Sequence, residues 1–186
     1  MRAITGPSEL PDDVDLTGAG KAPLTAPSTF DAARFREVLG HFCTGVTVIT
    51  AVDGGEPVGF TAQSFTSVSL DPPLAAVCPA RTSNSWPRIR STGVFCANVL
   101  AEDQEAMGRV FATRGADKFR GVGWALSPGT GSPILDGVLA WVDCRIEAEH
   151  DGGDHLVVLA RVVDLGLGDG GRPLLFYRGG YGRFEV

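Results

Sequence analysis

The 186-residue sequence lacks the features that mark membrane-spanning, secreted and nucleic-acid-binding proteins. No stretch approaches the ~20 apolar residues of a membrane helix, and the N-terminus has no continuous apolar segment like that of a signal peptide. Positive charge is also scarce, with 16 Lys and Arg against 22 Asp and Glu. The resulting net charge of −6 argues against a nucleic acid or an anionic membrane surface as partner.

Cysteine is sparse as well. The four cysteines lie far apart, form no C-x-x-C pair and each adjoin an apolar run; they are Cys43, Cys78, Cys96 and Cys144. This pattern is typical of buried thiols in a reducing compartment, so we expect a cytoplasmic protein without disulfides or structural zinc. The Walker sequence and the G-x-S-x-G motif are missing, and no motif arranges the serines and the three histidines as a nucleophile triad.

The first residues differ in composition from the rest. Residues 1–28 contain four prolines, several small residues and a cluster of aspartates, which predicts a flexible N-terminal tail. The remaining residues, 29–186, are enough for one domain with a sizeable core.

Three short helices are expected in this domain. After a cap at Ser28 or Thr29, apolar residues recur at helical spacing, at Phe35, Val38, Leu39 and Phe42. A second helix is predicted from Ser85, its cap, to about Gly93, and a third carries an apolar stripe within residues 102–113.

Strands account for most of the rest. "GVTVITAV" and "PVGFTAQSF" flank the turn Asp53-Gly54-Gly55, and "VFCANVL" and "PLLFY" are further apolar strands. The clearest pair lies within residues 137–167, where alternating side chains, the turn "DGGD" and a second apolar run predict a long hairpin. This pattern favours an antiparallel barrel with peripheral helices. The long, glycine-rich segment 113–137 is a candidate wall of a site.

The stretch "GFTAQSFTSVSLDPPLAAV", residues 59–77, combines a strand pattern with many small polar side chains. It ends at Pro72 and Pro73, which mark a turn or a sheet edge, because proline has no N–H for a sheet ladder. The stretch is either a Ser/Thr-rich connection between strands or a row of donors that faces a ligand with many acceptors.

The turn "EHDGGDHL" gathers two imidazoles and two carboxylates, from His150, Asp151, Asp154 and His155. A solvated turn is the preferred interpretation, and a metal-dependent enzyme built on these residues is the alternative. His155 begins an apolar strand, so we expect its ring at the rim of the barrel, where it can contact a ligand.

Five segments carry a family resemblance: "TGVTVIT", "GFTAQSFTSVSLDPPL", "FCANVL", "DKF" and "GDH". Their order and spacing, over roughly residues 30–184, resemble the short-chain flavin reductases, the reductase components of two-component flavin-dependent monooxygenases. The resemblance implies an antiparallel Greek-key split β-barrel of the flavin reductase/FMN-binding type. It also implies a homodimer that binds flavin at the subunit interface and uses NADH or NADPH as the hydride donor.

The resemblance further implies which residues contact the flavin: Gly45, Val46, Thr47, Thr61, Ala62, Gln63, Ser64, Ser67, Val68, Ser69, Cys78 and Ala80. Ser83, Asn84 and Ser85 precede a short helix whose N–H groups favour a phosphate, and Lys118 adds positive charge. His155, as the catalytic residue, and the aromatic end with Tyr181 and Phe184 are implied for the nicotinamide. Hydride transfer between stacked rings needs no protein acid or base, so position is the catalysis.

The sequence therefore predicts an NAD(P)H:flavin oxidoreductase that hands reduced flavin to a separate monooxygenase. NADH is the expected donor, and FAD is slightly preferred over FMN. The alternative is a similar barrel that holds flavin as a fixed prosthetic group for electron transfer or sensing.

Overall fold

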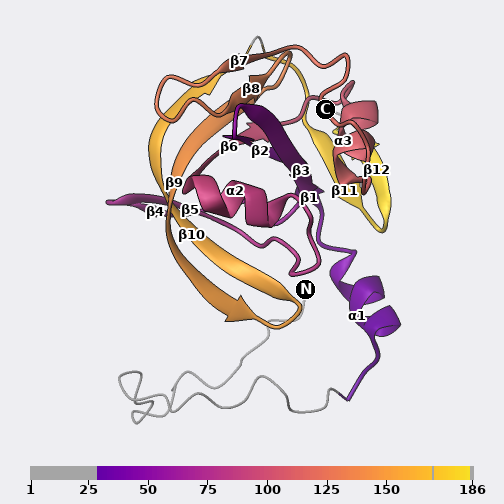
Figure 1. Ribbon diagram of the computed structural model, residues 1–186. Helices are drawn as coiled ribbons and strands as arrows, with labels where there is room; N and C mark the ends of the chain where they lie inside the picture. The colour runs from indigo at the N-terminus through magenta and orange to yellow at the C-terminus, as the bar shows by residue number, and fades with distance from the viewer. Residues whose placement is uncertain (1–28, 169, 185–186) are drawn as a thin grey trace, which may run out of the picture. The chain divides into compact units, whose positions relative to one another are not determined.

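The computed structural model describes residues 29–168 and 170–184. The predicted tail, residues 1–28, therefore lies outside the described residues. Asp31–Val186 forms one compact unit. Strands dominate in it, which agrees with the predicted mainly β fold (Figure 1).

The helices are short and the strands vary in length. The helices are α1 (Ala32–Leu39), α2 (Trp86–Thr92) and α3 (Glu105–Ala112). The strands are β1 (Thr44–Gly45), β2 (Thr47–Asp53), β3 (Glu56–Ala62), β4 (Thr66–Leu70), β5 (Pro73–Val77), β6 (Val94–Val99), β7 (Trp124–Leu126), β8 (Pro133–Leu135), β9 (Ala140–Gly152), β10 (His155–Leu167), β11 (Leu174–Tyr177) and β12 (Gly180–Arg183).

The main sheet has seven strands in the order β3-β2-β6-β9-β10-β5-β4, and its neighbours are antiparallel. Its ends, β3 and β4, are not paired with each other, as expected for a split barrel. A three-stranded sheet, β1-β11-β12, and the hairpin β7-β8 complete the strands. In Figure 1 the long β9–β10 hairpin curves past α2.

Both predicted hairpins are present. Between β2 and β3, Asp53 pairs with Glu56 across Gly54 and Gly55, whose φ angles of +60° and +87° suit a two-residue primed turn. Between β9 and β10, Gly152 pairs with His155 across a turn in which Gly153 has φ +77°. Glycine adopts these angles without the steric cost of a Cβ.

Apolar side chains pack against both faces of β2. Successive residues of a strand point to opposite faces, so Ile49 and Val48 of β2 enter different clusters. The Ile49 cluster includes Trp86 and Ile89 of α2, while the Val48 cluster includes Phe111 of α3 and Leu174 of β11. The faces of β2 and β3 are thus held between α2 and α3, which positions the site described below.

The predicted loop 113–137 contains the short hairpin β7–β8, which its glycine-rich composition concealed. Buried polar groups attach this hairpin to the sheet. Asn98 Oδ1 accepts from the N–H of Leu135 at 2.8 Å, and its Nδ2 donates to the carbonyl of Pro133 at 3.2 Å. Thr130 Oγ1 donates to the buried Asp143 carboxylate at 2.5 Å. Residues 130–135 are therefore held against the sheet, whereas residues 115–119 of the same segment line the cleft described below.

The sequence prediction was wrong for the cap of α1, whereas for α2 it gave the correct N-cap position but not the hydrogen bonding. Asp31, not Ser28 or Thr29, caps α1, since its carboxylate accepts from the N–H of Arg34 at 2.7 Å. Ser85 occupies the N-cap position of α2, but its hydroxyl makes no capping bond; the Ser83 hydroxyl accepts from the N–H of Trp86 at 3.1 Å instead. The Ser85 hydroxyl instead donates a hydrogen bond to the carbonyl of Gly59, in the site described below.

Candidate functional site

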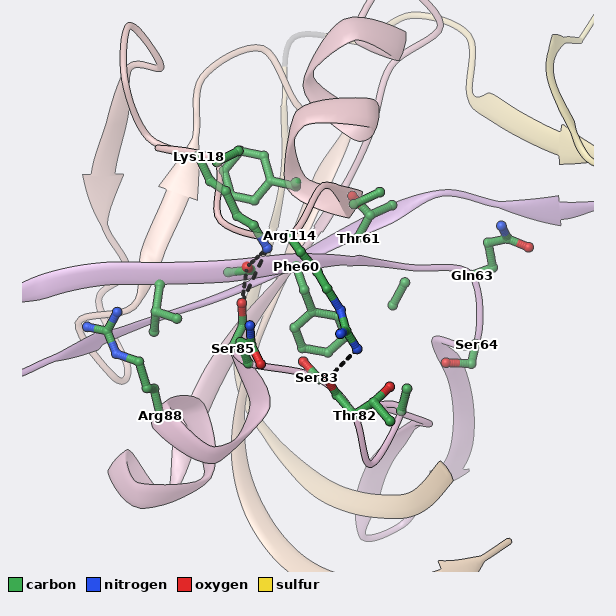
Figure 2. A pocket seen from close by; sticks show the side chains of 18 of the residues that line it. Phe60, Thr61, Gln63, Ser64, Thr82, Ser83, Ser85, Arg88, Arg114 and Lys118 are labelled. Carbon is green, nitrogen blue, oxygen red and sulfur yellow. Dashed lines mark hydrogen bonds between the residues drawn. The ribbon is translucent and has the colours of Figure 1, made fainter. Parts of the chain in front are cut away.

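One cleft of about 1720 Å³ lies among β3, the segment from Cys78 to Arg88, and the start of the 113–137 loop (Figure 2). Many sequence-predicted residues line it: Thr61, Ala62, Gln63, Ser64, Cys78, Ala80, Ser83, Asn84, Ser85, Lys118, His155 and Tyr181. The fold thus brings together residues from "GFTAQS", "SNS", "DKF" and "GDH", which are far apart in the chain.

The other predicted residues lie outside this cleft: Gly45, Val46, Thr47, Ser67, Val68, Ser69 and Phe184. The side chains of Val46 and Thr47 are buried, and the Thr47 hydroxyl donates to the carbonyl of Ala62 at 2.9 Å. By contrast Val68, on the edge strand β4, and Phe184 are about half exposed, at 51% and 52%. Their contact with flavin stays a prediction.

Gly59 organises the floor of the cleft. Its carbonyl accepts from the Ser85 hydroxyl at 2.8 Å and from Lys118 Nζ at 3.0 Å. A Cβ on Gly59 would lie 2.8 Å from the carbonyl oxygen of Ile49 and 2.9 Å from Cε1 of Phe111, so only glycine fits. Gly59 was not among the predicted site residues, although a glycine inside a strand signals close approach of another group.

Lys118 has no carboxylate partner among the residues that the structure describes. Its ammonium contacts only neutral oxygens, since its second partner is the Ser85 hydroxyl at 3.3 Å, and burial lowers the pKa of its amine. Arg114 is similar, because its guanidinium donates to the carbonyl of Thr82 at 2.7 Å. No carboxylate among the described residues pairs with either side chain. Both cations face the segment 82–85, where the cleft can therefore receive an anion.

Arg114 and Arg88 are cleft residues that the sequence analysis missed. The only available signal for Arg114 was its place in the glycine-rich loop, four residues before Lys118. Arg88 differs from Arg114 because carboxylates neutralise it. Its Nε lies 2.7 Å from Asp53 Oδ2, and its Nη2 lies 3.8 Å from Glu56 Oε2.

The hydroxyls of the polar stretch are mainly engaged with the protein. Thr61 Oγ1 donates to the carbonyl of Gly108 at 2.6 Å and so attaches α3 to β3. Ser64 Oγ accepts from the N–H of Cys78 at 2.9 Å. Gln63 is exposed, and no described residue hydrogen-bonds its side chain. The predicted row of side-chain donors is thus partly structural, and Gln63 is an exposed member that lines the cleft.

His155 and Tyr181 form the remaining polar and aromatic walls. His155 Nδ1 lies 2.8 Å from Asp154 Oδ1, and this hydrogen bond lowers the pKa of the Asp154 carboxyl. The Tyr181 ring packs edge to face with Phe176, and the Arg109 guanidinium lies 4.7 Å from the centre of the Tyr181 ring. Burial raises the pKa of the Tyr181 phenol.

The alternative metal site does not assemble at this rim. The Asp151 carboxylate pairs with Arg81, and the Asp154 carboxylate contacts His155. Among the residues that the structure describes, no group of three His, Cys, Asp or Glu side chains is arranged to hold a metal ion.

Comparison with known proteins identifies the family. The model of the flavin reductase like domain matches residues 39–185. The chain belongs to the flavin reductase-like family. It is 52% identical over 171 residues to the reductase subunit HsaB of a flavin-dependent monooxygenase from Rhodococcus jostii, which covers 92% of this chain and 86% of that protein.

Solved structures of flavin reductase-like proteins share the fold. Nitrilotriacetate monooxygenase component B from Mycobacterium thermoresistibile superposes with a TM-score of 0.80 at 51% identity, covering 82% of this chain and 86% of that one. The NADH:FAD oxidoreductase SgcE6 of Streptomyces globisporus, solved with NAD and FAD fragments, has a TM-score of 0.78 at 39% identity, covering 83% and 93%. The predicted family and the predicted mainly β fold are confirmed.

Proposed function

We propose that this protein is an NADH-dependent flavin reductase that supplies reduced flavin to a partner flavin-dependent monooxygenase. Family membership supports the reaction class, and the cleft supports its location in this chain. The observation that carries the location is the pair Arg114 and Lys118, two cations without carboxylate partners among the described residues, in a protein of net charge −6. A flavin phosphate provides the missing negative charge.

The size and lining of the cleft fit a flavin and a nicotinamide dinucleotide together. Pockets for drug-sized ligands are about 300–1,000 Å³, whereas this cleft is about 1720 Å³. Small side chains, such as Ala62, Ser64 and Ala80, leave room for flat rings at one end of the cleft. His155 and Tyr181 lie on its walls, where they can orient the nicotinamide.

The residues act by binding and orientation. When bound, flavin would supply the hydride acceptor, and the protein would contribute by holding the two rings together in the required orientation. Lys118 and Arg114 hold the phosphate, and Gly59 fixes the Lys118 ammonium and the Ser85 hydroxyl on a single carbonyl. The His155 imidazole contacts the exposed Asp154 carboxylate at the rim, and this hydrogen bond favours one orientation of the ring.

The proposal includes a homodimer, in which a second copy of the chain covers the exposed apolar face of α1. Val38 and Leu39 of α1 are each 51% exposed, and Leu39 also lines the cleft, so an apolar helix face continues into the site. A second copy packed there would cover that face and close the cleft on this side. Sedimentation analysis of the wild type and of Val38→Asp tests this arrangement: the variant should become monomeric, and a dimer that persists unchanged would contradict it.

The direct test mixes the protein, NADH and either FAD or FMN in air and follows the nicotinamide absorbance. Flavin-dependent loss of NADH is expected, with FAD the better substrate. Absence of any flavin-dependent loss would refute the proposed function. Release of flavin on gel filtration distinguishes a diffusible substrate from a fixed prosthetic group.

The four cysteines are free thiols, which supports a cytoplasmic location. Within the described part of the chain, every helix is too short or too polar to span a membrane.

A further inference from the structure

β3 forms one side of the cleft along its full length, so the residues of β3 mark positions along the cleft. Glu56 and Pro57 line one end, Gly59 lies in the middle, and Thr61 to Ser64 line the other end. At about 3.3 Å per residue, Gly59 is about 10 Å from Glu56 and about 7 Å from Thr61. Figure 2 shows the same order, with Arg88 at one end, Lys118 and Ser85 between, and Gln63 and Ser64 at the other end.

The charge of the cleft differs between sections along β3. The middle section, beside Gly59, carries the two cations that lack carboxylate partners among the described residues, Lys118 and Arg114. In the Arg88 end, by contrast, one guanidinium lies between the two carboxylates of Asp53 and Glu56. Phosphate groups are attracted to the middle section, whereas the negative balance of the Arg88 end disfavours them.

The Arg88 end has the chemistry to bind a neutral nucleoside. A guanidinium held by carboxylates at its edge keeps its flat faces available, and such faces stack on aromatic rings. The Glu56 side chain is 81% exposed, so its carboxylate can also accept hydrogen bonds from ribose hydroxyls or from an exocyclic amino group. Pro57 adds an apolar surface beside them.

We propose that the Arg88 end of the cleft binds the adenosine of FAD and that Arg88 determines the preference for FAD over FMN. The inference rests on the proposed function, which places the flavin ring at the Thr61–Ser64 end and its phosphate beside Lys118. FMN ends at its phosphate and therefore does not reach Arg88. FAD continues past the middle section into the Arg88 end.

The test measures KM and kcat for FAD and for FMN at saturating NADH, in the wild type and in Arg88→Ala and Arg88→Lys. Both variants should raise the KM for FAD about three- to tenfold and leave the FMN parameters unchanged. Both lack the flat guanidinium face, and lysine shows that the charge alone does not replace it. Adenosine diphosphate should compete with FAD in the wild type and about three- to tenfold less strongly in Arg88→Ala. Arg161→Ala is the matched control, since Arg161 also pairs with a carboxylate, that of Glu147, and has the same 41% side-chain exposure outside the cleft.

Each other outcome overturns the inference in a recognisable way. An equal rise in KM for FAD and FMN would mean that Arg88 only shapes the cleft, and a rise for NADH alone would mean that this end binds the hydride donor. An unchanged KM for FAD would mean that Arg88 touches no ligand. A wild-type protein that oxidises NADH with neither flavin would instead refute the proposed function. Circular dichroism of the variants separates unfolding from a loss of contact.

Discussion

Replacing Gly59 by alanine should destabilise the protein, because the added methyl group has no room. The new Cβ would lie 2.8 Å from the carbonyl oxygen of Ile49 and 2.9 Å from Cε1 of Phe111, closer than nonbonded carbon contacts allow. Neither neighbour can move easily, since Ile49 and Phe111 are each 0% exposed in well-packed clusters. Overpacking of this kind costs about 1–3 kcal/mol. We expect a loss of this size in the free energy of unfolding, measured by urea denaturation.

The same substitution should weaken flavin binding, because a displaced Gly59 carbonyl no longer aligns the Lys118 ammonium and the Ser85 hydroxyl. Gly182→Ala is the control. A Cβ at Gly182 would have no neighbour within 4 Å, and the residue lies outside the cleft. We expect its free energy of unfolding to stay within about 0.5 kcal/mol of the wild type. A loss of less than 0.5 kcal/mol in Gly59→Ala would refute the packing argument, even if flavin reduction were impaired.

Three further predictions address charge, orientation and pH. Lys118→Gln should raise the KM for FMN and FAD about tenfold or more, as for a lost charged hydrogen bond, but not that for riboflavin, which has no phosphate; an equal effect on riboflavin would contradict the phosphate role. His155→Asn should raise the KM for NADH more than it lowers kcat, and an unchanged KM would remove His155 from the nicotinamide site. Burial raises the pKa of the Cys144 thiol to about 12 from 9.0, so the thiol stays protonated in the folded state while it ionises in the unfolded chain. The contribution of Cys144 to the free energy of unfolding is therefore complete below about pH 9 and should be lost between pH 9 and 12, by up to about 1.4 kcal/mol per pH unit. Urea denaturation of Cys144→Ala should show a smaller slope, and an equal slope would contradict this source.

Local pattern predicted those parts of the fold that local interactions determine. The alternating run of β9 and the glycine turns of the two hairpins were readable because side-chain period and positive φ angles depend on neighbouring residues. The cap of α1 was missed because Ser28, Thr29 and Asp31 all have capping side chains, and only the start of the helix selects Asp31. β12 was missed because its sequence, "GYGR", has little strand propensity and is held by pairing with β11.

The candidate site was only partly predictable for the same reason. The resemblance selected segments, and the fold decided which of their atoms face the cleft. Thr47 belongs to a matching segment, yet its hydroxyl is buried against Ala62. The Ser85 hydroxyl was expected to cap a helix, but it donates a hydrogen bond to the Gly59 carbonyl. These residues are 26 positions apart, so no local pattern predicts the contact.

The arginines show most clearly why partners matter more than residue type. Arg88 and Arg114 both line the cleft, and both would read as solvated charges in the sequence. Only the fold gives Arg88 two carboxylates and gives Arg114 a neutral carbonyl. A cation whose charge is already balanced can offer a flat face to a neutral ring, whereas a cation that contacts only neutral oxygens still attracts an anion. If charge balance decides ligand chemistry in this way, Arg114→Gln should weaken binding of both FMN and FAD, while Arg88→Ala should weaken binding of FAD alone.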